Sequence, residues 1–291
     1  MPQNLLSLVT AELAEPADPR AAAMAGALAA QYPDAARAVL FYGSCLRERN
    51  LDGLMLDFYL IVSDYRAAYG KSWLAAANRL IPPNVFPFEH NGLIAKYAVL
   101  SEADFARLNS SAADNVSVWA RFAQPSRLLW AADDLARQRA ISAVANAAPT
   151  LLSLAWPMSE AQDALALWKT GFTLTYNAEL RAEKKGRSLS IVDADPQRYS
   201  RFGNAALAQG LPSSPHNAAE RWRQLQRRGK WLSVVRLAKA SFTYAGGIDY
   251  LAWKINRHAG TAIAIKPWQR RWPLLGALTL LPRLFRGGAI R

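Results

Sequence analysis

The sequence is poor in the residues that build disulfides and zinc sites. Its 291 residues include one cysteine, Cys45, and three histidines that lie far apart without the spacing of metal ligands. A single cysteine excludes an internal disulfide and a cysteine-built zinc site. We therefore expect neither a disulfide-stabilised scaffold nor a zinc centre, and a reducing compartment fits this composition.

Long hydrophobic runs are also missing. No apolar run reaches the roughly 20 residues that a membrane-spanning helix needs, and the longest candidate, residues 272–282, is bounded by Pro and Arg. The N-terminal segment lacks the basic start of a signal peptide and carries acids early. These features predict a cytoplasmic protein that can still lie peripherally on the inner face of the cell membrane.

Acidic residues are scarce in the last third of the chain. Residues 201–291 contain 16 Lys and Arg but two acids, Glu220 and Asp249, whereas residues 1–200 contain 19 basic and 20 acidic residues. The net charge of +13 therefore comes from the C-terminal third. A basic segment of this kind favours a polyanionic partner, either nucleic acid or an anionic membrane.

Strand and helix patterns are mixed in the first hundred residues, which predicts an α+β domain. We expect helices at 20–32 and 66–80, and strands at 36–44, at 54–62 and on both sides of an Asn91-Gly92 turn within 84–101. From Ser101 onward the pattern is helical, beginning with a Ser cap and an acid three residues later.

The domain organisation follows from these changes of pattern. Residues 201–219 are rich in Gly, Pro, Ser and Asn, which is typical of a linker. We expect an α+β domain, a mostly helical second domain, that linker, and a basic amphipathic region that faces a membrane; their bounds are 1–104, 105–200, 201–219 and 220–291.

One short pattern suggests chemistry. Gly43-Ser44 follows a predicted strand, and Asp57 stands thirteen residues after the serine in the apolar run LMLDFYLIV. A Gly-Ser turn at a helix start can bind a triphosphate through backbone N–H groups, and a strand carboxylate can hold Mg²⁺ against the phosphates. The alternative is a simple strand-to-helix turn, although a charge within this run is costly to bury without a partner. This layout is that of the nucleotidyltransferase superfamily related to DNA polymerase β.

The usual second strand acid is absent, because Met55 stands two positions before Asp57. A second metal ligand must then come from elsewhere in the chain. The acids that we considered are Asp52, Asp64, Glu89 and Glu179.

Several motifs taken together resemble a known family, the mitochondrial translocator assembly and maintenance proteins, which are mitochondrial-type CDP-diacylglycerol synthases. The similar segments are YGS, MLDF at 55–58, KYAVLS at 96–101, SVWARFAQPSRLLW at 117–130 and TYNAELRAEKKGRSLSIV at 175–192. The resemblance is collinear over about 40–203. It implies a polymerase-β-like nucleotidyltransferase domain followed by a mostly helical domain, and the Ala/Arg-rich composition favours a bacterial member.

The resemblance also implies roles for individual residues. Gly43 and Ser44 would bind the CTP triphosphate, and Asp57 would hold Mg²⁺. Lys96 would contact a phosphate, although a solvated strand-end lysine is the alternative. Arg181 would contact CTP or the phosphatidate headgroup, and Glu179 would be a weaker metal ligand, standing where the family has Asp.

Two features depart from the family's pattern. Its His-Tyr-Ser stretch is not recognisable, the nearest region being 67–73, and the Gly before its later acid is Ala178 here. The resemblance thus implies a phosphatidate cytidylyltransferase that joins CTP and phosphatidate into CDP-diacylglycerol and pyrophosphate. Two alternatives stay open: a nucleotidyltransferase with another acceptor, such as RNA or a small molecule, and a catalytically inactive membrane-binding module.

The basic region mixes Arg and Lys with tryptophans, among them Trp222, Trp231 and Trp268. Trp at headgroup depth and Arg or Lys on lipid phosphates are typical of an interfacial helix. The alternative is a packed helical subdomain with Trp in its core. RNA could use the same charges, but no RNA-binding motif accompanies them, so we expect an anionic membrane as partner rather than nucleic acid.

Overall fold

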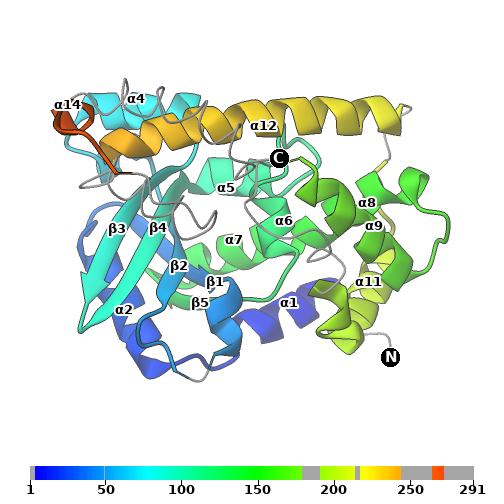
Figure 1. Ribbon diagram of the computed structural model, residues 1–291. Helices are drawn as coiled ribbons and strands as arrows, with labels where there is room; N and C mark the ends of the chain where they lie inside the picture. The colour runs from blue at the N-terminus through cyan, green and yellow to red at the C-terminus, as the bar shows by residue number, and fades with distance from the viewer. Residues whose placement is uncertain (1–3, 49, 179–190, 214–216, 244–263, 272–291) are drawn as a thin grey trace.

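A five-stranded mixed sheet forms the centre of the protein, and helices cover both of its faces (Figure 1). The computed structural model describes residues 4–48, 50–178, 191–213, 217–243 and 264–271. The strand order is β3-β4-β2-β1-β5, in which β2 and β4 run parallel and the other neighbours run antiparallel. The expected α+β class is confirmed.

The first four strands lie where β-prone apolar runs predict them, with the most apolar run, β2, at the centre of the sheet. Asn91 and Gly92 both have positive φ, 48° and 77°, as a two-residue hairpin turn between β3 and β4 requires. The strand bounds are β1 Ala36–Tyr42, β2 Met55–Val62, β3 Asn84–His90, β4 Leu93–Ser101 and β5 Ser126–Ala131.

Four of the helices α1 to α5 begin at a capping side chain, and α4 is the exception. Asn4, Asp18, Asp64 and Ser101 each accept a hydrogen bond from a backbone N–H in the first turn that follows. The Ser101 cap expected from the sequence is therefore confirmed. The bounds are α1 Leu5–Leu13, α2 Pro19–Ala30, α3 Tyr65–Ala68, α4 Ser72–Leu80 and α5 Glu102–Leu108, with the 3-10 helix η1 at Ser44–Arg47.

Strand β5 lies beyond the boundary expected at residue 104, within the segment assigned to the mostly helical second domain. It pairs antiparallel with β1, with Leu128 opposite Leu40 and Ser126 opposite Tyr42. The sheet therefore recruits residues 126–131 from beyond that boundary. The motif SRLLWA is short and follows a helical pattern, so the distant partner β1 decides its conformation.

The remaining helices follow β5 along the chain. Helix α11 takes up the first half of the segment expected as a linker, because its Phe202, Ala205 and Ala206 are buried and Gly203 packs against Trp168 of α9. The bounds are α6 Trp119–Phe122, α7 Asp134–Ala145, α8 Ala147–Ala155, η2 Trp156–Met158, α9 Ala164–Tyr176, α11 Pro196–Gln209, α12 Ala218–Thr243 and α14 Pro267–Arg271.

Each face of the sheet has its own hydrophobic core. One core joins β-strand residues such as Leu40, Tyr59 and Leu100 to α1 and to the helices that extend as far as Trp222 and Leu225. The second core lies on the opposite face, under α2 and α3. The expected helical domain thus shares one continuous core with the sheet, and that core forms the floor of the candidate site.

Candidate active site

Four polar side chains form a row across the sheet. In register, Ser126 of β5 lies beside Tyr42 of β1, Tyr42 beside Asp57 of β2, and Asp57 beside Lys96 of β4. Alternate residues of a strand share a face, so Asp57 points to the side of Tyr59, the side that the C-terminal helices cover. The sequence motifs around Gly43, Asp57 and Lys96 therefore meet in one place.

Asp57 is the centre of this row. Its Oδ1 atom is 2.8 Å from Lys96 Nζ, and the two side chains are 21% and 31% exposed. Oδ1 is buried and accepts no well-aligned hydrogen bond within the described part of the chain. The Lys96 ammonium thus balances the charge of this carboxylate in the structure.

The backbone of Gly43 closes the other side of the carboxylate. Gly43 has φ 96° and ψ −167°, a conformation open essentially to glycine. A Cβ atom at this position would lie 3.2 Å from Asp57 Oδ2. The glycine therefore serves two needs, the turn itself and the close approach of the backbone to the carboxylate.

The helix after Gly43 is shorter than the triphosphate-binding pattern implies. Residues Ser44–Arg47 form a 3-10 helix, because the chain must return to begin β2 at Met55. Ser44 is exposed at its start. The turn at Gly43-Ser44 therefore precedes only one short helical turn, and no long helix dipole points at it.

Two groups beside Asp57, the Tyr42 hydroxyl and the Cys45 thiol, keep their protons. Burial, and then the nearby Asp57 carboxylate, raise the pKa of Tyr42 well above its ordinary value, and Arg121 opposes this only in part. Burial, and then Asp57, also raise the pKa of the Cys45 thiol, whose Sγ lies 3.5 Å from the Met55 carbonyl oxygen. Cys45 is thus a buried thiol rather than a nucleophile.

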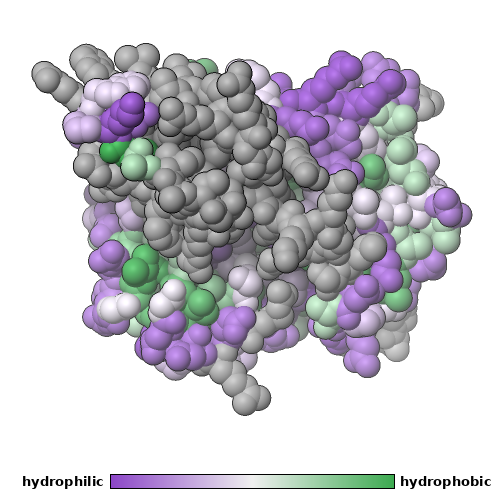
Figure 2. Space-filling view, in the orientation of Figure 1, coloured by the Kyte–Doolittle hydropathy of each residue, from purple (hydrophilic) through white to green (hydrophobic). Residues whose placement is uncertain are grey.

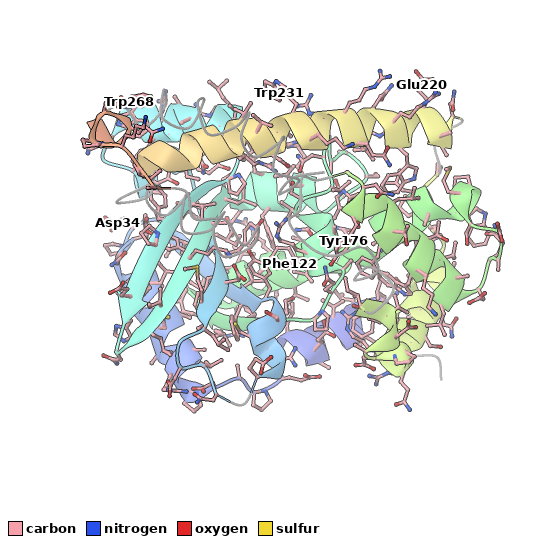
Figure 3. All side chains as sticks on the ribbon, in the orientation of Figure 1. Asp34, Phe122, Tyr176, Glu220, Trp231 and Trp268 are labelled. Carbon is pink, nitrogen blue, oxygen red and sulfur yellow. The ribbon has the colours of Figure 1, made fainter. Side chains whose placement is uncertain are left out.

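Arg121 is a site residue that the sequence analysis did not single out. It lies on α6, next to Phe122, which packs on Tyr42 and Tyr59 at ring-centroid distances of 6.1 and 5.2 Å (Figure 3). No local signal marks Arg121, because its nearness to Tyr42 depends on how α6 packs over the sheet. The aromatic contacts make this side of the row apolar.

The other acids considered as metal ligands are engaged elsewhere or lie outside the described residues. Asp52 pairs with Arg20 at 2.7 Å, Asp64 caps α3, and Glu89 is exposed on β3. Glu179 and Arg181 both lie outside the described residues. Within the ranges that the structure describes, no three His, Cys, Asp or Glu side chains form a metal-binding group.

The donor set nevertheless fits Mg²⁺ that arrives with a nucleotide. Mg²⁺ keeps several waters and is commonly bound by one or two carboxylates together with substrate phosphates. Asp57 supplies one carboxylate with a buried oxygen that lacks a well-aligned hydrogen bond, and the cradle at Gly43 excludes a side chain beside it. Asp57 would hold the ion, and Glu179 stays a prediction.

Several basic side chains of the C-terminal region bind groups within the protein. On the inner face of α12, Arg221 donates to the Ala113 carbonyl at 2.7 Å, Arg228 pairs with Asp114 at 2.5 Å and Arg236 donates to the Pro82 carbonyl at 2.8 Å. Trp222 is buried and donates to the Leu154 carbonyl. The first part of this region therefore packs against the rest of the protein, as expected for a packed helical subdomain with Trp in its core.

The outer face of α12 keeps the other charges in solvent. Arg223, Arg227 and Lys230 are exposed, and Trp231, which follows Lys230, is 60% exposed. Figure 2 shows hydrophilic surface over the N-terminal half of α12. Among the helices that the structure describes, none combines the length and apolarity needed to cross a bilayer.

Comparison with known proteins adds no family to these observations. No protein-family model matches the chain, and no curated protein matches it.

Proposed function

We propose that the protein is a Mg²⁺-dependent nucleotidyltransferase whose reaction is that of a CTP:phosphatidate cytidylyltransferase. The observation that carries the proposal is the Asp57 carboxylate, which lies between the Gly43 backbone and Lys96 with a buried oxygen that accepts no well-aligned hydrogen bond. A strand carboxylate beside a glycine turn is what nucleotidyl transfer needs, because both must contact the same triphosphate. The choice of CTP and phosphatidate rests on the family resemblance.

The reaction requires positioning and charge neutralisation rather than a covalent enzyme intermediate. A phosphate oxygen of phosphatidate attacks the α-phosphorus of CTP, the bond from that phosphorus to the β-phosphate oxygen breaks, and pyrophosphate leaves. Backbone N–H groups at Gly43-Ser44 bind the triphosphate. Bound Mg²⁺ would supply charge neutralisation at the phosphates, and Asp57 would hold it.

Lys96 has two successive partners in this proposal. In the structure its ammonium neutralises Asp57 at 2.8 Å. A triphosphate at Gly43-Ser44 offers the ammonium a more highly charged partner, and a flexible lysine can follow it. Arg181, which lies outside the described residues, stays the proposed contact to CTP or the headgroup.

The proposed location is the inner face of the cell membrane, where the protein would be peripheral. The exposed Arg223, Arg227, Lys230 and Trp231 of α12 support it. Each basic residue near an anionic leaflet contributes about 1 kcal/mol. Because phosphatidate is itself anionic, the same charges would concentrate the substrate.

An assay with radiolabelled CTP, Mg²⁺ and phosphatidate vesicles tests the proposal, with label in the organic phase as the product. Wild type should form the product, and Asp57→Asn should form none while unfolding at the same denaturant concentration. An active Asp57→Asn enzyme would contradict the site assignment. Product that forms without phosphatidate would indicate another acceptor, RNA or a small molecule.

A second candidate, a catalytically inactive membrane-binding module, is favoured by one observation. The Lys96 ammonium balances the charge of Asp57 without a metal, and among the described residues Asp57 belongs to no group of three metal-binding side chains. This candidate predicts vesicle binding without Mg²⁺-dependent CTP binding. Titration calorimetry with CTP, in Mg²⁺ and then in EDTA, distinguishes the two.

A further inference from the structure

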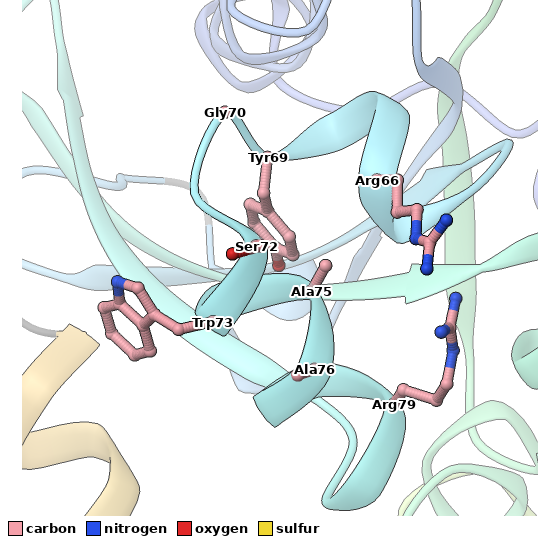
Figure 4. A pocket seen from close by; sticks show the side chains of 8 residues that line it. All are labelled: Arg66, Tyr69, Gly70, Ser72, Trp73, Ala75, Ala76 and Arg79. Atoms are coloured by element: carbon pink, nitrogen blue, oxygen red, sulfur yellow. The ribbon is translucent and has the colours of Figure 1, made fainter.

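A second cavity lies away from the Asp57 row. Helices α3 and α4 and the turn between them enclose a cavity of about 570 Å³ whose lining includes Arg66, Tyr69, Ser72, Trp73 and Arg79 (Figure 4). Helix α3 follows the C-terminal end of β2, whereas Asp57 is the third residue of that strand. Tyr69 also belongs to the core on the opposite face of the sheet. The cavity and the row are therefore separate sites.

Two arginines converge in this cavity. Figure 4 shows the guanidinium groups of Arg66 and Arg79 facing one another. The nearest acid is Asp64, whose Oδ2 is 3.8 Å from Arg79, while its Oδ1 accepts the backbone N–H of Arg66. Within the described ranges, the Arg66 guanidinium has no acidic partner. Two like charges that face one another are unfavourable unless an anion lies between them, and guanidinium pairs bind phosphate oxygens well.

Neutral donors stand on the same cavity wall. Tyr69 is 7% exposed, and the side chain of Asn84 lies close to its hydroxyl. Burial raises the pKa of Tyr69, so the hydroxyl keeps its proton as a donor. Ser72 begins α4, whose first turn has no capping side chain among the described residues. Guanidinium, hydroxyl and helix N–H groups together select an oxygen-rich anion.

Helix α4, which lines the cavity, also carries exposed apolar side chains. Trp73 is 49% exposed at one end of α4 and Leu80 is 79% exposed at the other. Trp231 of α12 and Trp268 of α14, 60% and 43% exposed, lie on the same side of the molecule as α4 (Figures 1 and 3). Tryptophan beside exposed basic residues is typical of side chains that enter the headgroup layer of a membrane.

We propose that the α3–α4 cavity binds the phosphate of an anionic membrane lipid through Arg66 and Arg79, while Trp73 inserts beside it. The site would hold the protein on the bilayer and take no part in catalysis at Asp57. It does not depend on the proposed reaction, because the Asp57 row contributes none of its side chains.

Co-sedimentation with phosphatidylcholine vesicles, with and without phosphatidate, tests the site on the full chain. The Arg66→Gln/Arg79→Gln double variant should bind phosphatidate vesicles about 25-fold more weakly, since each basic residue near the surface contributes about fivefold. Arg139→Gln is the matched control, because Arg139 is 55% exposed and paired with an acid, as Arg79 is at 56%. Its binding should change less than about twofold.

Trp73→Ala should also weaken binding, and Trp156→Ala, at a tryptophan 38% exposed on η2, should not. Asp57→Asn should bind vesicles as wild type does, which separates this site from the proposed reaction. Equal losses in the arginine double variant and in Arg139→Gln would overturn the proposal in favour of diffuse surface charge. Protection from thermal unfolding by inorganic phosphate, with unchanged vesicle binding in the double variant, would overturn the lipid assignment.

Discussion

Replacing Gly43 by alanine perturbs the candidate site at its most constrained point. The φ of 96° and ψ of −167° lie in a region that costs other residues about 1–3 kcal/mol. The added Cβ would lie 3.2 Å from Asp57 Oδ2, so the carboxylate must move by a few tenths of an ångström. We therefore expect Gly43→Ala to lower the free energy of unfolding by about 1–3 kcal/mol and to weaken Mg²⁺-dependent CTP binding at the same time.

Gly53→Ala is the matched control for this experiment. Gly53 also has a positive φ, 71°, but a Cβ there meets nothing within 4 Å. It should lose about 1–2 kcal/mol of stability through backbone strain alone and keep its affinity for CTP. Urea denaturation measures the first quantity and titration calorimetry the second. Unchanged stability of Gly43→Ala, or an equal loss of CTP affinity in both variants, would refute the reasoning.

Three further predictions follow from the packing. Burial, and then the charge of Arg236, lower the pKa of Lys239 to about 7. Because an unfolded lysine still binds its proton up to about pH 10, the free energy of unfolding should rise by about 2–3 kcal/mol between pH 7 and 9. Lys239→Met should flatten this rise when the free energy of unfolding is measured by urea denaturation at each pH. Gly203→Ala should destabilise the protein by about 1–3 kcal/mol, since the added Cβ would lie 2.8 Å from Trp168 Nε1. Gly26→Ala, which has free space in α2, should stabilise it by about 0.5–1 kcal/mol. A change of melting temperature in the same direction in both variants would contradict this reading of the packing. Ser126→Ala should leave stability unchanged or slightly higher, because its buried hydroxyl has no partner among the described residues, and a loss above about 1 kcal/mol would show an unseen hydrogen bond.

The central part of the fold could be predicted because its signals are local. The run at 54–62 is apolar enough to require a central strand, and Asn91-Gly92 adopts the positive φ values that its hairpin needs. Ser101 caps its helix through a side chain three residues from its partner. In each case the deciding interaction lies within a few residues of the motif, so the sequence contains it.

The features that the sequence did not reveal depend on contacts between residues far apart in the chain. Strand β5 depends on pairing with β1, about 90 residues earlier. Gly203 made part of α11 resemble a linker, yet the glycine is there because Trp168 of another helix packs against it. Likewise, the sequence does not show that Arg236 donates to the Pro82 carbonyl, because the two residues lie 154 positions apart.

The candidate site falls between these two cases. Gly43 and Asp57 could be singled out from spacing alone, as a turn before an acid in an apolar strand. That Lys96 neutralises this acid follows from the parallel register of β2 and β4, which sets the two residues side by side. Arg121 could not be found, because only the packing of α6 brings it near Tyr42.

The buried pair of Glu12 and Arg198 has a consequence for synthesis on the ribosome. The Arg198 guanidinium binds both carboxylate oxygens of Glu12 across 186 residues and also donates to the Ala123 carbonyl. Until Arg198 has left the exit tunnel, α1 lacks its partner and the acid must stay hydrated. We therefore expect the larger core to complete its packing only after α11 has been synthesised. Until then, the face of the sheet that this core covers should stay partly exposed to solvent.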